Sequence, residues 1–382
     1  MARMITPDLL YRGLQDGTVE TLLDLRTPDS YEDWHLPGTI NLPYHPDDTF
    51  PEDALPTALE PDERVVIICA EGQSSTAFAK ELTTRGFENI EILQDGMAGW
   101  SRLYRVVSIP TAAPQLECFQ FQRIAKGCLS YLICSFDTHE AVAVDPSRHL
   151  EEYEFVAEDD EMTITDVIDT HVHADHVSGG RALADETGAT YHLPAAASDR
   201  GVSVPFEGLD HTQVIELDGI ELKAIETPGH TSDSMAILIN AEAVLTADTL
   251  FVDAVGRTEL EAGAEGAKAA AEELYESIHR SLLTLPDATT VLPGHHTVPE
   301  GSAMMNTPGD PVLTTVGDLR ESVDLLQASR ETFIEAVVSG EAATPPNYER
   351  LIAINTGQDQ LADTAEAITL ELGPNRCAAG TH

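Results

Sequence analysis

Apolar positions in the first hundred residues come in short unbroken runs. The runs cover residues 21–26, 64–69 and 90–93, and continuous apolar runs of this length are typical of buried parallel strands. Between the last two runs, residues 75–87 have the apolar spacing of an amphipathic helix that stops at a glycine. This order predicts an α/β domain over residues 1–106.

The pattern changes after a Pro- and Ala-rich segment, residues 107–117, which is predicted to be a linker. Strand-type alternation then returns in pairs of runs separated by turn residues, which is typical of β-hairpins. Helical periodicity appears in three longer stretches. Hairpins are expected at 127–145, 214–225 (with a turn at Asp218 and Gly219) and 234–248, and helices at 179–188, 264–284 and 316–339. Residues 118–382 are therefore expected to form a second, mixed α/β domain.

The balance of charge narrows the classes of partner. The chain of 382 residues has 66 acidic and 21 basic residues, a formal net charge of −45. A chain this acidic repels nucleic acid and anionic membranes, so neither is expected as a partner. The acidic residues are spread along the whole chain rather than gathered in a tail. This spread indicates adaptation to a salt-rich cytoplasm, where ions screen the self-repulsion.

Neither a targeting signal nor a disulfide framework is expected. The N-terminal segment lacks the apolar core of a signal peptide, and no apolar run approaches the ~20 residues of a membrane span. The five cysteines, odd in number and scattered, favour a reducing cytoplasm. Cys118, Cys128 and Cys134 lie in apolar, strand-like sequence and are expected in the core. Cys377 has no sequence neighbour that would activate it.

Cys69 has a different setting, because it ends an apolar run and precedes a predicted helix. Loop N–H groups and a helix N-terminus place partial positive charge beside such a sulfur atom. This environment stabilises a thiolate, a persulfide anion or a bound oxyanion. The same position also suits a small, inert core residue. On spacing alone both interpretations stay open.

The sequence around Cys69 resembles a rhodanese domain over residues 6–104. The matching motifs are Asp24 and Arg26 at a strand end, His35–Gly38 with Asn41, Cys69 at the head of its loop, and Gly96–Trp100 at the closing helix. The resemblance implies an α/β fold with a parallel sheet and helices on both faces. It also implies that Cys69 accepts sulfur within a persulfide loop formed by Glu71, Gly72, Gln73, Ser74 and Ser75.

One position departs from the rhodanese pattern. The family loop usually has an arginine where this chain has Ser74. A hydroxyl thus replaces a planar, charged fork that would bind oxyanions. Persulfide formation on Cys69 is expected, with a degenerate, structural domain as the alternative.

A second group of candidate residues is dense in metal-binding side chains. Four of them lie within six residues: His171, His173, Asp175 and His176. Alternation places the first two histidines on one side of an extended backbone. Three further candidates follow turn signals or strand ends: His230, Asp248 and His295. Seven such side chains at strand ends predict a metal site.

The ordered motifs His-x-His-x-Asp-His, Pro-Gly-His-Thr, a strand-end Asp and a final His resemble the metallo-β-lactamase superfamily over residues 118–300. The resemblance implies an αββα sandwich, followed here by a C-terminal helical extension. The superfamily covers thioester hydrolysis, nuclease, lactamase and oxygenase chemistry, so the fold does not name the reaction.

Residues 170–180, 248–260 and 344–355 narrow the resemblance to persulfide dioxygenases. That resemblance implies one Fe(II) per chain, held by the 2-His-1-carboxylate set of non-haem iron oxygenases. Carried onto this chain, the ligands are His171, His230 and Asp248. The residues expected to surround and orient them are His173, Asp175, His176 and His295. The same seven side chains could instead hold two Zn(II) ions bridged by Asp248, as in glyoxalase-II-type thioester hydrolases.

Together the two resemblances predict one enzyme. A persulfide dioxygenase would convert a low-molecular-weight thiol persulfide, O2 and water to thiol and sulfite. The rhodanese domain would transfer the same sulfane sulfur at raised local concentration. The alternatives are a binuclear zinc thioester hydrolase with a degenerate or sulfur-carrying rhodanese domain, and a non-catalytic sulfur carrier. The expected partners are small molecules, and a homodimer is left open.

Overall fold

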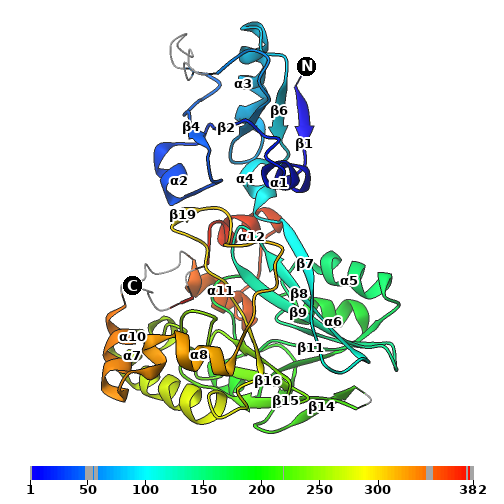
Figure 1. Ribbon diagram of the computed structural model, residues 1–382, viewed down its shortest axis with the longest axis vertical. Coiled ribbons are helices and arrows are strands. Elements are labelled where there is room, and N and C mark those ends of the chain that lie inside the picture. Colours follow the sequence, from blue (N-terminus) through cyan, green and yellow to red (C-terminus); the bar gives the residue numbers. More distant parts are fainter. Residues whose placement is uncertain are drawn as a thin grey trace.

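The computed structural model describes residues 2–47, 55, 59–217, 219–340, 347–375 and 377–378. Figure 1 shows a smaller N-terminal unit, coloured blue to cyan, above a larger unit that holds most of the remaining chain. Asp218 of the predicted hairpin turn and residues 344–346 of the third resembling stretch lie outside the described residues.

The N-terminal unit is built on a parallel sheet. Its described strands lie in the order β1–β6–β5–β2–β4, and every pairing among them is parallel. The strands are β1 (Arg3–Ile5), β2 (Thr21–Asp24), β4 (Ile40–Asn41), β5 (Val65–Ile68) and β6 (Ile90–Leu93). The helices are α1 (Pro7–Gln15), α2 (Pro28–Asp33), α3 (Gln73–Thr84) and α4 (Gly96–Trp100).

Burial on both faces explains why β5 is an unbroken apolar run. Ile67 packs in one apolar cluster with Phe78 of α3, whereas Ile68 packs in another with Leu10 of α1. Successive side chains of a strand point to opposite faces, so each face of the sheet has its own helical cover. The predicted α/β fold of this unit is confirmed.

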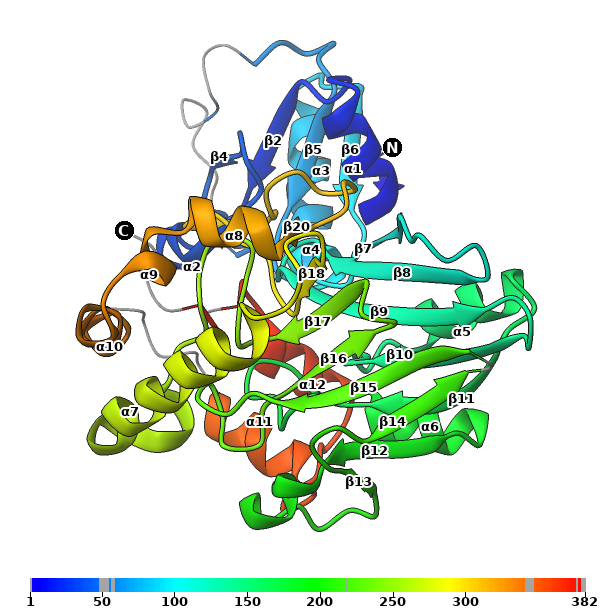
Figure 2. The same ribbon diagram turned by 60° about the horizontal axis from the view of Figure 1, so that its bottom comes forward.

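Two mixed sheets face each other in the larger unit (Figure 2). The described strands of the first lie in the order β13–β12–β11–β10–β9–β8–β7, and those of the second in the order β14–β15–β16–β17–β18–β20. The first sheet contains β7 (Tyr104–Ile109), β8 (Leu116–Arg123), β9 (Cys128–Ser135), β10 (Glu140–Val144), β11 (Thr163–Ile168), β12 (Thr190–Pro194) and β13 (Glu207–Leu209). The second contains β14 (Val214–Leu217), β15 (Ile220–Glu226), β16 (Met235–Ile239), β17 (Ala243–Ala247), β18 (Thr290–Pro293) and β20 (Thr314–Thr315).

Helices cover the outer faces of the two sheets. Tyr153 and Leu183, from two helices, pack on Leu132 of the first sheet, and Leu274 and Phe333 pack on the second. The helical segments are α5 (Leu150–Asp159), α6 (Gly180–Thr187), η1 (Ala195–Arg200), α7 (Glu259–Glu276), η2 (Ser277–Leu282), α8 (Val316–Ser322), α9 (Asp324–Gln327), α10 (Arg330–Ser339), α11 (Tyr348–Asn355) and α12 (Thr364–Glu371). This is the predicted αββα sandwich with a C-terminal helical extension. Among the described residues, no helix combines the length and apolar character needed to cross a bilayer.

Two of the predicted helices differ from the structure in detail. The stretch 316–339 is divided into α8, α9 and α10, because Val323 and Ala328 have extended backbone between them. The helix α10 then restarts with Ser329, whose side chain accepts a hydrogen bond from a backbone N–H. The helix predicted at 264–284 corresponds to the part of α7 that follows a kink at Gly263, whose backbone is not helical (φ 65°, ψ 173°), and its last turns form the π-helical η2.

The two units are joined by direct packing as well as by the chain between them. β7 pairs with β8 at the edge of the first sheet, so the expected linker 107–117 supplies residues to both strands. The strand β3 (Trp34–His35) of the N-terminal unit pairs with β19 (Gly301–Ser302) of the larger unit. The indole N–H of the buried Trp100 donates to the carbonyl oxygen of Ala303 over 2.7 Å. The junction therefore has an apolar and hydrogen-bonded interface.

Candidate active sites

The persulfide loop lies where β5 ends and α3 begins. Cys69 is buried, and the backbone N–H of Gly72 donates to its Sγ over 3.0 Å. Gly72 caps α3 with a φ of 90°, a conformation that suits glycine. The sulfur thus lies beside the N-terminus of α3, which carries partial positive charge.

Close backbone packing against α4 holds this loop. The N–H of Met97 donates to the carbonyl oxygen of Cys69 over 2.9 Å, and that of Ala98 donates to Ala70 over 3.1 Å. A Cβ on Gly96 would lie 2.2 Å from the carbonyl oxygen of Cys69. The close approach therefore requires glycine at this position.

The other motif residues of the N-terminal unit form its frame. Arg26 and Asp24 make a buried ion pair of 2.6 Å, and the side-chain amide of Asn41 donates to the carbonyl oxygen of Arg26 over 2.9 Å. In the loop itself, Glu71 is exposed and Ser74 is partly buried. The Ser75 hydroxyl is buried without a hydrogen-bond partner among the described residues, and the Gln73 side chain lies outside them.

In the larger unit, His171, His230 and Asp248 converge from three loops. His171 follows β11, His230 lies between β15 and β16, and Asp248 follows β17. The Nε2 atoms of His171 and His230 lie 3.9 and 3.6 Å from Oδ2 of Asp248, and each side chain is at most 3% exposed. Ligand atoms bound about 2.1 Å from one ion are roughly 3–3.5 Å apart. The three atoms are therefore close to the spacing that one ion requires.

Hydrogen bonds determine which atom of each side chain faces the shared space. The Thr170 hydroxyl donates to Asp145 and lies 3.0 Å from Nδ1 of His171. Nδ1 of His230 donates to the carbonyl oxygen of Arg257 over 2.7 Å. These contacts leave Nε2 of both histidines for another partner.

Asp248 also has one engaged and one free oxygen. Its Oδ1 accepts from Nδ1 of His295 over 2.6 Å. Its Oδ2 is buried and has no hydrogen-bond partner among the described residues. A buried carboxylate oxygen without a partner is costly, and its position between two imidazole nitrogens fits a metal cation.

Electrostatics agrees with this assignment. Burial by itself raises the pKa of Asp248, but the neighbouring His295, His230 and His171 outweigh burial and hold the pKa well below its usual range. Burial and the adjacent His173 lower the pKa of His171 well below its usual value. A carboxylate and a neutral imidazole are the forms that bind metals.

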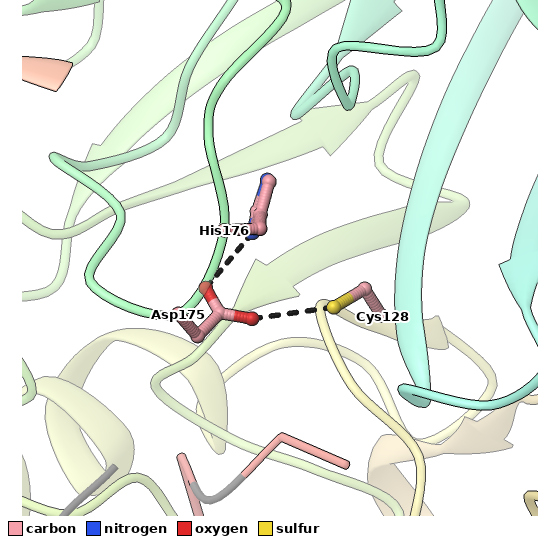
Figure 3. Close-up of side chains that lie close together, drawn as sticks. All are labelled: Cys128, Asp175 and His176. Carbon is pink, nitrogen blue, oxygen red and sulfur yellow. Dashed lines mark hydrogen bonds and ion pairs between the residues drawn. The ribbon is translucent and has the colours of Figure 1, made fainter. Parts of the chain in front are cut away.

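Asp175 is the centre of a second group beside the first (Figure 3). Its Oδ1 accepts from Nδ1 of His176 over 2.8 Å, and its Oδ2 accepts from Sγ of Cys128 over 3.2 Å. Nε2 of His295 lies 3.0 Å from the same Oδ2, so His295 bridges Asp175 and Asp248. Single ligand atoms of Asp175, His295 and Cys377 also lie within 4.8 Å of one another.

The ring of His173 packs against those of His171 and His176, and its Nε2 faces carboxylates. Its Nε2 lies 3.2 Å from Asp145 and 3.7 Å from Asp169. Its Nδ1 is buried with no hydrogen-bond partner among the described residues. A small cavity runs along these side chains, and its wall includes Tyr104 and Cys128.

The structure thus brings all seven predicted histidines and aspartates together, and it adds four residues: Cys128, Cys377, Asp145 and Asp169.

Cys118 and Cys134 lie in apolar clusters, as expected. Cys128 is buried too, but its thiol contacts Asp175, which its apolar sequence does not indicate. Cys377 lies beside Asp175 and His295, which are remote from it in the sequence. Asp145 and Asp169 follow β10 and β11, so their strand-end positions were a usable signal.

Family models divide the chain in the same way. Residues 6–103 match the rhodanese-like domain. Residues 123–295 match the metallo-beta-lactamase superfamily.

Two relatives are similar to part of this chain. An uncharacterized protein of Mycobacterium tuberculosis is 32% identical over 201 residues, covering 44% of this chain and 86% of the relative. A hydroxyacylglutathione hydrolase of Polaromonas sp. is 34% identical over 169 residues, covering 44% of this chain and 61% of the hydrolase.

Solved structures extend the likeness. A metallo-beta-lactamase from Staphylococcus aureus superposes with a TM-score of 0.58 at 28% identity, covering 65% of this chain and 74% of that chain. ETHE1 from Myxococcus xanthus superposes with a TM-score of 0.53 at 26% identity, covering 67% of this chain and 99% of that chain. The chain therefore belongs to the metallo-beta-lactamase superfamily and carries a rhodanese-like domain ahead of its metallo-beta-lactamase unit.

Proposed function

We propose that this chain oxidises a low-molecular-weight thiol persulfide to sulfite and thiol at one Fe(II) ion, and transfers sulfane sulfur through Cys69. The observation that carries the proposal is the convergence of His171, His230 and Asp248, whose ligand atoms lie within 4.8 Å of one another, with Oδ2 of Asp248 buried and without a hydrogen-bond partner among the described residues. Two histidines and one carboxylate leave further positions open for substrates, as in non-haem iron oxygenases. The structural likeness to ETHE1 supports the same reaction class.

In the proposed reaction, one persulfide anion, O2 and water give one thiol, one sulfite dianion and one proton. The S–S bond breaks, and the two sulfur atoms together lose four electrons, which reduce O2. Iron(II), when bound, supplies the redox chemistry that lets O2 react with the persulfide. The protein holds His171 and His230 through their Nδ1 atoms and keeps the site buried from bulk water.

The proposal of one ion keeps the hydrogen bonds of Asp175 in place. Both of its oxygens already accept hydrogen bonds, from His176 on one side and from Cys128 on the other. A second ion would have to replace these contacts. In the proposal, Asp175 instead orients His295, which in turn orients Asp248.

Cys69 is proposed to carry sulfur between thiols. Its thiolate attacks the outer sulfur of a persulfide donor, the donor thiolate leaves, and a cysteine persulfide forms. The N–H of Gly72 and the N-terminus of α3 stabilise the resulting anion. Because both units are on one chain, sulfur released from Cys69 reaches the second site at raised local concentration.

A second candidate function has its own support. The likeness to a hydroxyacylglutathione hydrolase favours a hydrolase that holds two Zn(II) ions with the same seven side chains. Such an enzyme would cleave a thioester without O2. Metal content and oxygen dependence therefore separate the two candidates.

The test is oxygen consumption by the iron-loaded protein in molar salt, with glutathione persulfide as substrate. We expect oxygen uptake with equimolar sulfite. His230→Ala should abolish uptake, whereas Cys69→Ser should leave uptake intact and abolish sulfur transfer to a thiol acceptor. Folded, iron-loaded protein that consumes no oxygen would refute the proposal, and thioester hydrolysis by the zinc-loaded protein would support the second candidate.

A further inference from the structure

The C-terminal segment, described over residues 347–375 and 377–378, lies outside the part of the chain that matches the superfamily model, residues 123–295. It nevertheless packs beside the metal-binding loops. In Figure 1 its helices α11 and α12, coloured orange to red, are drawn below the N-terminal unit. Hydrogen bonds connect this segment to two of the loops that carry candidate metal ligands.

Asn355, the last residue of α11, makes three of these hydrogen bonds. Its side-chain amide donates to the carbonyl oxygens of His173, over 2.9 Å, and of His176, over 2.8 Å. Its Oδ1 accepts from the backbone N–H of Ser178 over 3.0 Å. One side chain therefore satisfies three backbone groups of the loop that holds His171, His173, Asp175 and His176.

Glu371, at the end of α12, binds the same loop. Its Oε1 accepts from the backbone N–H of Val177 over 2.8 Å. Its Oε2 pairs with both Arg123 and Arg148 at 3.0 Å, and the carboxylate is fully buried. The two arginines hold the carboxylate in place, and the carboxylate holds the loop.

The end of the segment reaches the loop that supports His230. The carbonyl oxygen of Cys377 accepts from the backbone N–H of Arg257 over 3.0 Å. The carbonyl oxygen of Arg257 is the group that accepts from Nδ1 of His230. Ala378 also forms a β-bridge with Gly256.

The loop from 171 to 178 needs such partners because it has neither helical nor strand structure. Its buried backbone groups cannot pair within a regular ladder, and unpaired buried groups are costly. The start of the loop is held from the sandwich itself, since the N–H of Thr170 donates to Asp145 and that of Val172 donates to Asp233. The second half is held by Asn355 and Glu371.

We propose that the C-terminal segment is part of the metal centre, and that Asn355 is a positioning residue for the loop carrying four of the seven metal-site side chains. The inference rests on the proposed function in one respect, the binding of a metal at this site. It does not depend on whether the bound metal oxidises a persulfide or hydrolyses a thioester.

The test measures Co(II) binding and the visible absorption of the Co(II) protein, starting from metal-free full-length chain. Asn355→Ala should weaken Co(II) binding about 10- to 100-fold, the range found when groups that orient ligands are removed. It should also shift the Co(II) absorption bands, because the ligands are then less well oriented. The matched control is Gln358→Ala, which removes a hydrogen bond of 3.2 Å to the carbonyl oxygen of Gly201 in the same segment.

Wild-type affinity and an unchanged spectrum for Asn355→Ala would overturn the inference, as would equal losses in both variants. If Asn355→Ala does not fold, Asn355→Asp decides the question, because it keeps the acceptor for Ser178 and loses both donors. Wild-type Co(II) binding by that variant would also overturn the inference. Tight Co(II) binding by the wild type without oxygen uptake on persulfides would refute the proposed reaction alone.

Discussion

At the scale of single residues, hydrogen bonds determine which atom of each candidate metal ligand faces the shared space. His171 and His230 each engage Nδ1 in a hydrogen bond and present Nε2. Asp248 engages Oδ1 with His295 and presents Oδ2. The residue types were predictable from the sequence as a metal-binding pattern. Which atom is free depends on partners such as Arg257, which no local pattern indicates.

His149 illustrates how burial changes one residue. Its Nδ1 lies 3.2 Å from the Tyr104 hydroxyl. Burial, with help from Arg123 and Arg148, lowers its pKa to about 2. The folded protein therefore keeps His149 neutral, whereas the unfolded chain binds a proton below about pH 6.5. We expect His149 to leave stability unchanged above that pH and to reduce it by about 1.4 kcal/mol per pH unit as the pH falls toward 2.

Chemical denaturation at constant molar salt measures this effect. Between pH 7.5 and pH 5, the His149→Gln variant should lose about 2 kcal/mol less unfolding free energy than the wild type. His45→Gln, at a histidine side chain that is 66% exposed, serves as the control and should follow the wild type. Equal pH dependence for the wild type and His149→Gln would contradict the expectation.

At the scale of elements, the site forms where strand ends meet. Ala247 pairs with Pro293 in the parallel register of β17 and β18, and the N–H of Gly294 donates to the carbonyl oxygen of Ala247 over 2.8 Å. This register brings Asp248 beside His295. The apolar runs of the strands were readable from the sequence because burial on two faces leaves an unbroken pattern. The helix ends were less readable, because breaks such as Val323 depend on local backbone conformation.

Gly294 tests the importance of this close approach. A Cβ at Gly294 would lie 2.6 Å from Oδ1 of Asp248. We expect Gly294→Ala to displace the Asp248 carboxylate and to weaken Co(II) binding about 10- to 100-fold, with the chain still folded. Equilibrium titration of the metal-free protein with Co(II) measures the change.

Gly208→Ala, in the edge strand β13, is the matched control, since its nearest contact for an added Cβ is 3.3 Å away. It should bind Co(II) like the wild type. Wild-type binding by Gly294→Ala would mean that Asp248 does not need this geometry.

At the scale of the whole molecule, charge and packing work against each other. The net charge of −45 spreads over the chain, and self-repulsion of this size opposes the compact state. Several of the few cations are used inside, as where Arg123 and Arg148 pair with Glu371. The apolar interface around Trp100 then joins the two units. We propose that high salt is the condition in which this balance favours folding.

Salt dependence of thermal unfolding tests this proposal. The melting temperature should rise with KCl concentration, most steeply below about 1 M, where the screening length falls to about 3 Å. Metal-free protein should be used, so that salt effects on metal binding do not contribute. A melting temperature that is the same in millimolar and molar KCl would refute adaptation to salt.

The sequence by itself determined the two folds, the position of Cys69 and the set of seven metal-site side chains. These follow from local information, namely apolar periodicity, strand-end positions and spacing within a loop, together with the resemblance of the ordered motifs to two known families. Tertiary structure alone decided that Cys128 and Cys377 join Asp175, that His295 bridges two carboxylates, and that Asn355 holds the histidine loop. These contacts join residues far apart in the chain. They arise only when the sheets close and the C-terminal helices pack against the loops, so no local pattern encodes them.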